Sequence, residues 1–144
     1  MGEDVGVLKL DHIGIVVRDL EATAAAWEQV LGLTLEEVEE YQGILRIGFL
    51  PLGEMDVELI QPTTQEGLNA DFLREQGEGV HHVAFAVTDL EAAVERALER
   101  GARLLLAPTV GARGRRIAFL EGEGLGGTIV ELVAAPEASG DPPP

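Results

Sequence analysis

Apolar and amphipathic segments follow one another in an order that occurs twice along this chain. Leu8–Val17 (LKLDHIGIVV) and Val80–Val87 (VHHVAFAV) are short, apolar and rich in β-branched side chains, which is typical of strands. After each comes a segment whose apolar residues recur at helical spacing, over 20–32 and 90–101. The pattern therefore predicts a strand followed by a helix in each half of the chain.

Capping residues support the two predicted helices. Asp19 and Asp89 precede them as N-caps, and Gly32 and Gly101 follow where a glycine ends a helix. Three further strands are predicted after each helix, and a short helix near 69–77 connects the halves. The predicted strands cover 33–41, 44–52 and 56–61 in the first half, and 102–108, 115–121 and 127–135 in the second.

The two halves are copies of one unit. An offset of 70 residues pairs His12 with His82, and an offset of 73 pairs VELIQP (57–62) with VELVAAP (130–136). Two matches in the same order predict a duplicated βαβββ unit and an α+β fold. The expected organisation is an N-terminal arm (1–7), a first module (8–67), a connecting segment (68–79), a second module (80–135) and a disordered tail (136–144).

Composition excludes several classes of protein. The net charge of −16 argues against a nucleic-acid partner, because neutralising phosphates requires a basic face. The absence of cysteine excludes a disulfide framework and a thiolate metal site. No apolar run approaches the roughly 20 residues that span a bilayer, and the acidic N-terminus is unlike a signal peptide. We therefore expect no membrane contact and a cytoplasmic location.

Four residues at equivalent places in the two halves are candidate metal ligands: His12, Glu58, His82 and Glu131. A buried carboxylate costs several kcal/mol unless a positive group compensates it. A divalent cation would compensate both acids and use both imidazoles, and this donor set suits Zn²⁺, Ni²⁺, Co²⁺, Mn²⁺ or Fe²⁺. A lone histidine at a strand end is more often a hydrogen-bonded core residue, and that alternative stays open, but the repetition favours a metal site.

Two further features are candidates with open alternatives. His81 stands beside His82 and is either a hydrogen-bonding partner of that ligand or an ordinary hydrogen-bonded residue. Arg113, Arg115 and Arg116 are a dense basic cluster in an acidic chain. They either bind a coenzyme A phosphate or a substrate carboxylate, or they are solvated hairpin residues.

The duplicated unit with its His, Glu, His, Glu order resembles the vicinal oxygen chelate superfamily, which includes glyoxalase I, extradiol dioxygenases and fosfomycin-resistance proteins. The resemblance runs from Leu8 to Val133. It is strongest to the methylmalonyl-CoA epimerase family, through KLDHIGIVVRDLEATAAAWEQVLG, VELIQPTT, DFLREQGEGVHHVAFAV and VGARGRRIAFL. It implies two βαβββ modules in an eight-stranded cup-shaped sheet around one metal ion.

The resemblance also implies an activity. The expected reaction is interconversion of (R)- and (S)-methylmalonyl-CoA in propionyl-CoA metabolism, by proton abstraction at C2 through an enolate. Glu131 would be both a metal ligand and the base. The implied cofactor is a divalent ion, Co²⁺ ahead of Zn²⁺, Ni²⁺ or Mn²⁺, and the implied partners are an acyl-CoA substrate and a second copy of the chain in a homodimer.

The second acid–base group is left open by the sequence. Some epimerases carry a glutamate in the third strand, where this chain has ILRIGFL with Arg46 close by. Arginine stays protonated and cannot serve as an ordinary base. The alternative activities are a glyoxalase I-like lactoylglutathione lyase and a non-catalytic ligand-binding or resistance protein on the same fold.

Overall fold

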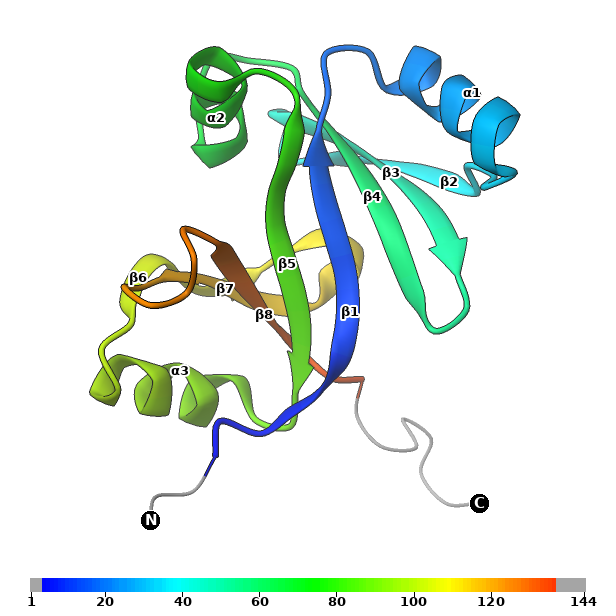
Figure 1. The fold of residues 1–144 in the computed structure, drawn as a ribbon. Helices are drawn as coiled ribbons and strands as arrows, with labels where there is room; N and C mark the ends of the chain where they lie inside the picture. Colours follow the sequence, from blue (N-terminus) through cyan, green and yellow to red (C-terminus); the bar gives the residue numbers. More distant parts are fainter. Residues whose placement is uncertain (1–3, 137–144) are drawn as a thin grey trace. The chain divides into compact units, whose positions relative to one another are not determined.

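The computed structural model describes residues 4–136, so nearly all of the expected tail lies outside it. The described residues follow the predicted βαβββ order in both halves (Figure 1). The elements are β1 (Val7–Val16), α1 (Leu20–Leu31), β2 (Glu37–Tyr41), β3 (Leu45–Leu52), β4 (Met55–Pro62), α2 (Leu68–Gln76), β5 (Gly79–Val87), α3 (Leu90–Glu99), β6 (Arg103–Val110), a 3₁₀ turn (Ala112–Gly114), β7 (Arg116–Glu121) and β8 (Ile129–Ala134).

The chain divides into two compact units. The first, here called the central unit, runs from His12 to Val83. The second, the terminal unit, comprises the described residues before His12 and after Val83. Both boundaries fall inside strands, so β1 and β5 each contribute residues to both units.

In the central unit the strand order is β2-β3-β4-β1-β5. β1 and β4 run parallel, with His12 opposite Asp56 and Val16 opposite Ile60. β2, β3 and β4 form an antiparallel meander. Helix α1 packs against β3 and β4 (Figure 1). Its contacts complete a hydrophobic cluster of Val17, Leu20, Ala24, Leu50, Val57 and Leu59, against which Trp27 packs.

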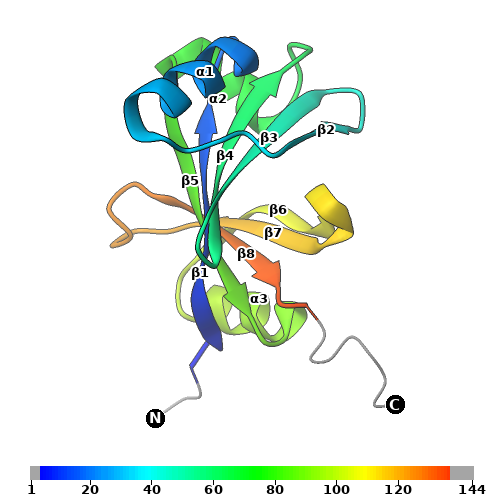
Figure 2. The ribbon, with the colours of Figure 1, turned by 90° about the vertical axis from the view of Figure 1, so that its right-hand side faces the viewer.

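In the terminal unit the order is β1-β5-β8-β7-β6. β6, β7 and β8 are antiparallel, and α3 packs against all three strands (Figure 2). The β6–β7 ladder shifts its register between Leu104 and Leu106 and again before Thr109. The hydrophobic cluster here consists of Val87, Leu90, Ala93, Val94, Ala118, Leu120 and Leu132.

The two hydrophobic clusters reproduce the repeat of the sequence. At an offset of 70, Val17 corresponds to Val87 and Leu20 to Leu90, and each of these four side chains is in the cluster of its unit. Each unit therefore buries the same strand–helix face under its own helix. The α+β fold with two βαβββ modules is confirmed.

Local signals explain three of the four ends of α1 and α3. The Asp19 carboxylate accepts a hydrogen bond from the Ala22 backbone at 3.0 Å, and Asp89 does the same for Ala92 at 3.1 Å. Such caps contribute about 1 kcal/mol each. Gly32 ends α1 in the left-handed conformation, with φ 76°. By contrast α3 ends one residue earlier than predicted, with Arg100 as its C-cap.

The second predicted strand is shorter than expected. It begins at Glu37, whereas the apolar pattern predicted residue 33 as its start. Leu33 and Leu35 instead pack against the hydrophobic cluster beneath α1, and this packing explains why they are apolar without being in the ladder. Apolar residues in a segment leading from a helix can serve the core while their backbone is irregular.

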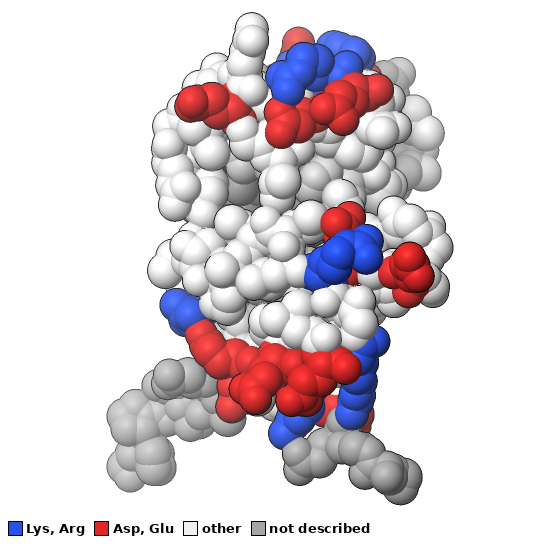
Figure 3. All heavy atoms as spheres, turned by 90° about the vertical axis from the view of Figure 1, so that its left-hand side faces the viewer, with Lys and Arg blue, Asp and Glu red and all other residues white. Residues whose placement is uncertain are grey.

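Acidic and basic side chains lie close together on the face that Figure 3 shows, with acidic ones in excess. The arrangement agrees with the net charge of −16. Between residues 4 and 136, no helix has the length and apolar character required to cross a membrane.

Candidate metal centre

Three of the four predicted ligands lie in the central unit, on strands that are neighbours in its sheet. His12 is on β1, Glu58 on β4 and His82 on β5, and β1 pairs with both of the others. Their exposed fractions are 5%, 7% and 3%. Polar groups buried to this degree are expected to have specific partners, since an unpaired one is costly.

The three side chains contact one another through defined atoms. Nδ1 of His12 lies 3.1 Å from Oε2 of Glu58, and Nε2 of His12 lies 3.2 Å from Nε2 of His82. The two imidazole planes meet at 84°. A neutral imidazole has one N–H and one acceptor nitrogen, so a His12 ring that donates from Nδ1 to the carboxylate presents its Nε2 lone pair toward His82.

This geometry fits a shared cation. Nitrogen ligands lie about 2.1 Å from zinc, so two of them on one ion are at most about 4.2 Å apart. The observed 3.2 Å between the Nε2 atoms is within that limit. Imidazole nitrogen together with carboxylate oxygen is a donor set that accepts Zn²⁺ and its neighbours in the first transition series.

Gly14 makes room for the His82 ring. In the parallel ladder it stands opposite Glu58. A Cβ added at Gly14 would lie 2.2 Å from Cε1 and 2.4 Å from Nε2 of His82, distances that carbon atoms do not adopt. The small residue beside His12 is therefore required by the approach of His82, and that approach brings the two imidazoles together.

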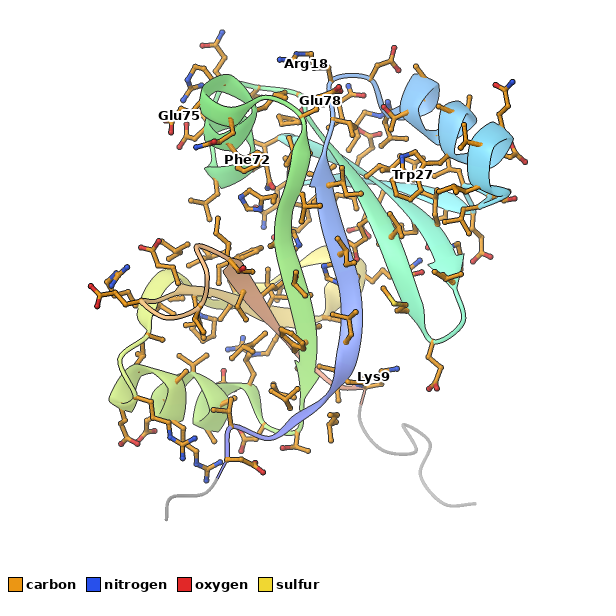
Figure 4. The ribbon with its side chains drawn as sticks, viewed as in Figure 1. Lys9, Arg18, Trp27, Phe72, Glu75 and Glu78 are labelled. Carbon is orange, nitrogen blue, oxygen red and sulfur yellow. The ribbon has the colours of Figure 1, made fainter. Side chains whose placement is uncertain are left out.

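A fourth side chain, that of His81, contacts the ring of His82. Strand alternation predicts His81 on the face opposite His82, yet their Nδ1 atoms are 2.9 Å apart. Nδ1 is the ring nitrogen nearer the backbone, so neighbouring residues can bring these atoms together. Phe72 of α2, on the side of the helix that faces β5 (Figure 4), packs edge-on against His81 with ring centroids 5.1 Å apart.

Glu131, the fourth predicted ligand, belongs to β8 of the terminal unit. It is 5% exposed and stands opposite Phe119 in the β7–β8 ladder. Glu58 stands opposite Phe49 in the β3–β4 ladder in the same way. The two glutamates thus have equivalent register and equivalent burial within their own units.

The arginines of the basic cluster have separate partners in the terminal unit. The Arg115 guanidinium donates to the Asp11 carboxylate at 2.9 Å and to the Ala134 carbonyl at 3.2 Å. Arg116 pairs with Glu91 of α3. Arg113 has a positive φ of 58° in the turn between β6 and β7. The contact of these arginines with coenzyme A or carboxylate stays a prediction.

Arg46, the residue near the position of the relatives' glutamate, belongs to an ion-pair network. Its guanidinium donates to both carboxylate oxygens of Glu21, at 2.9 and 2.5 Å, and to Glu40 at 3.0 Å. These carboxylates raise the pKa of Arg46 further, and the Arg46 guanidinium lowers the pKa of Glu21. Arg46 thus remains a cation and supplies no base.

The Arg46 network predicts a pH-dependent contribution to stability. Because the pKa of Glu21 is lowered in the folded protein, the pair stabilises the fold above the ordinary value of 4.5 and this contribution is lost as the pH falls through the folded value. Urea unfolding should show wild type more stable than Arg46→Gln at pH 7, with a difference that shrinks below pH 4.5. A difference independent of pH and of salt would contradict the ion-pair explanation.

Comparison with known protein families assigns the chain to a superfamily. The family model of the glyoxalase/bleomycin resistance protein/dioxygenase superfamily matches residues 11–119, well over half of the sequence. The chain belongs to this superfamily. An ethylmalonyl-CoA/methylmalonyl-CoA epimerase of Cereibacter sphaeroides is 36% identical over 129 residues, covering 86% of this chain and 96% of that protein.

Solved structures of superfamily members agree with this relationship. A Streptomyces coelicolor methylmalonyl-CoA epimerase variant in complex with 2-nitronate-propionyl-CoA superposes with a TM-score of 0.82 at 30% identity, covering 90% of this chain and 99% of that one. The epimerase of Mycobacterium tuberculosis gives 0.82 at 30% identity, with coverage of 94% and 93%. Membership of this superfamily implies a divalent metal, and the central unit contains His and Glu side chains that could hold one.

Sequence reasoning did not foresee one contact of the centre. The direct approach of His82 to Gly14 carries no sequence signal beyond the small residue itself. The contact between His81 and His82 is one of the two alternatives that the doubled histidine left open, although strand alternation predicts the opposite face for His81.

Proposed function

We propose that this protein is a metal-dependent epimerase that interconverts (R)- and (S)-methylmalonyl-CoA. The observation that carries the proposal is its similarity to the Cereibacter sphaeroides enzyme over nearly the whole of both chains, at 36% identity. A second support is the Streptomyces coelicolor epimerase, whose structure contains 2-nitronate-propionyl-CoA and which matches 90% of this chain.

The proposed ligands of the cation are His12, Glu58, His82 and Glu131. Within the central unit the first three already contact one another, with the two Nε2 atoms 3.2 Å apart. The case for Glu131 is its equivalence to Glu58, since each is buried and stands opposite a phenylalanine. When bound, a divalent cation supplies positive charge that stabilises the negative charge developing on the thioester oxygen.

The chain's own residues have distinct parts in the proposed reaction. Glu131 takes the proton from C2, so that the C2–H electron pair moves into the thioester and gives an enolate. Return of a proton to the opposite face of C2 completes the epimerisation. Glu58 and His12 are proposed to hold the cation together, and their side chains lie side by side, with Oε2 of Glu58 3.1 Å from Nδ1 of His12. Arg113, Arg115 and Arg116 are proposed to attract the anionic groups of the acyl-CoA.

Three finer assignments belong to the same proposal. Co²⁺ is the proposed native ion, ahead of Zn²⁺, Ni²⁺ and Mn²⁺, all of which accept nitrogen and oxygen ligands. The active form is proposed to be a homodimer, as the family resemblance implies. The proposed location is the cytoplasm, in keeping with a chain that contains no cysteine.

Removal and return of metal test the function. Chelator-treated protein should not exchange the C2 hydrogen of methylmalonyl-CoA for deuterium, and addition of Co²⁺ should restore the exchange, followed by NMR or mass spectrometry. Ethylmalonyl-CoA in a parallel assay would show how large a C2 substituent is accepted. Formation of S-lactoylglutathione without C2 exchange would point to a lyase, and tight acyl-CoA binding without exchange to a non-catalytic protein; either result rejects the proposal.

A further inference from the structure

His81 is a buried residue next to the proposed ligand His82. It is neither one of the proposed metal ligands nor the proposed base. Its exposed fraction is 4%, and its Nδ1 lies 2.9 Å from Nδ1 of His82. Its ring is also packed edge-on by Phe72, with an angle of 86° between the planes. A titratable ring held this firmly against another imidazole points to a function connected with that imidazole.

The hydrogen bond between the two Nδ1 atoms restricts which tautomers are present. In a neutral pair only one of the two facing nitrogens carries the hydrogen. If Nδ1 of His82 carries it, the Nε2 of His82 has a lone pair and can bind a cation. If Nδ1 of His81 carries it, the His82 proton is on Nε2, which then faces His12 as a donor and cannot bind a cation.

The partner of His12 shows which of the two tautomers of His82 is compatible with metal binding. A histidine that binds a metal usually donates its other N–H to a carboxylate or carbonyl, and this contact sets the tautomer and the ring orientation. His12 has such a partner, because its Nδ1 lies 3.1 Å from the Glu58 carboxylate. The corresponding atom of His82 faces the Nδ1 of His81.

We propose that His81 is a positioning residue that accepts the Nδ1–H of His82 and so keeps Nε2 of His82 available to the cation. This inference rests on the metal site of the proposed function, and adds to it a residue that touches neither cation nor substrate. In this structure the Nδ1 atoms of the two proposed imidazole ligands face unlike groups, the Glu58 carboxylate for His12 and the His81 ring for His82.

A matched pair of variants separates hydrogen bonding from packing. Asparagine and leucine have nearly the same shape, but only asparagine places a hydrogen-bonding group close to the position of Nδ1. His81→Leu should weaken Co²⁺ binding by about 10- to 100-fold, the usual effect of removing the partner of a ligating histidine. His81→Asn should restore most of the affinity. The measurement is a titration of chelator-treated protein followed by the visible absorption of bound Co²⁺.

The hydrogen bond can be observed directly in Zn²⁺-loaded protein. Long-range ¹H–¹⁵N correlation spectra of ¹⁵N-histidine-labelled wild type should place the ring hydrogen of His82 on Nδ1 and that of His81 on Nε2, so that Nδ1 of His81 is free to accept the hydrogen of His82. In His81→Asn the hydrogen of His82 should remain on Nδ1. The wild-type spectrum decides the matter even if His81→Leu fails to fold, since a hydrogen on Nδ1 of His81 would overturn the proposal.

Equal Co²⁺ affinity of wild type and His81→Leu would also overturn it. Neither readout depends on turnover, so a protein that binds Co²⁺ as described but does not exchange C2 of methylmalonyl-CoA would reject the proposed function and leave the part of His81 intact.

Discussion

Replacement of Glu131 by glutamine is expected to reduce exchange at C2 of methylmalonyl-CoA by about 10²- to 10⁴-fold, the range that loss of a general base produces. The amide has nearly the shape of the carboxylate but does not accept a proton near neutral pH. Glu131 is only 5% exposed and lies within the β7–β8 ladder, so a substitution there must keep the shape of the side chain. Glutamine keeps it, and the fold should therefore be unaltered. Deuterium incorporation at C2, measured with saturating Co²⁺, gives the rate.

Two control variants make the Glu131 result specific. Glu123→Gln changes an exposed acid of the same unit and should exchange at the wild-type rate. Glu58→Gln keeps an oxygen that can accept from Nδ1 of His12, so it should weaken metal binding without the same loss of exchange at saturating Co²⁺. If Glu131→Gln retains metal and exchanges as fast as wild type, the proposed base is wrong.

The repeat explains why so much of the fold could be predicted. Asp19 and Asp89 were recognised as helix caps from their place before apolar periodicity, and each accepts the expected backbone hydrogen bond. The two helices lie over equivalent hydrophobic clusters because the apolar positions of the halves correspond. The duplication thus allowed each element of the βαβββ unit to be predicted twice.

Contacts between residues far apart in the sequence could not be predicted from its periodicity. Arg46 lies close to Glu21 although 25 residues separate them, and this pairing depends on how α1 packs on the sheet. Arg115 likewise pairs with Asp11 from 104 residues away. An offset of 70 residues identified His12 and His82 as equivalent, but only the strand pairing of β1 and β5 brings their nitrogens to 3.2 Å.

The sequence repeat and the structure make opposite predictions for an alanine at position 14, where the chain has Gly14. The equivalent residue of the second module is Ala84, which is fully buried, so the repeat suggests that alanine is acceptable at 14. The structure predicts otherwise, because the new Cβ would lie 2.2 Å from the His82 ring. His82 is 3% exposed and has little space into which its ring can move.

Gly14→Ala is therefore expected to destabilise the protein by about 1–3 kcal/mol, the usual effect of overpacking, and to weaken Co²⁺ binding because the His82 ring must turn away. Urea unfolding and the Co²⁺ titration measure the two effects. The double variant Gly14→Ala/His82→Ala removes the overlap, so its loss of stability should be smaller than the sum for the single variants. Additive losses, or a Gly14→Ala protein with wild-type stability and Co²⁺ affinity, would mean that His82 does not occupy the space above Gly14, and the paired imidazoles at the centre would have to be reassigned.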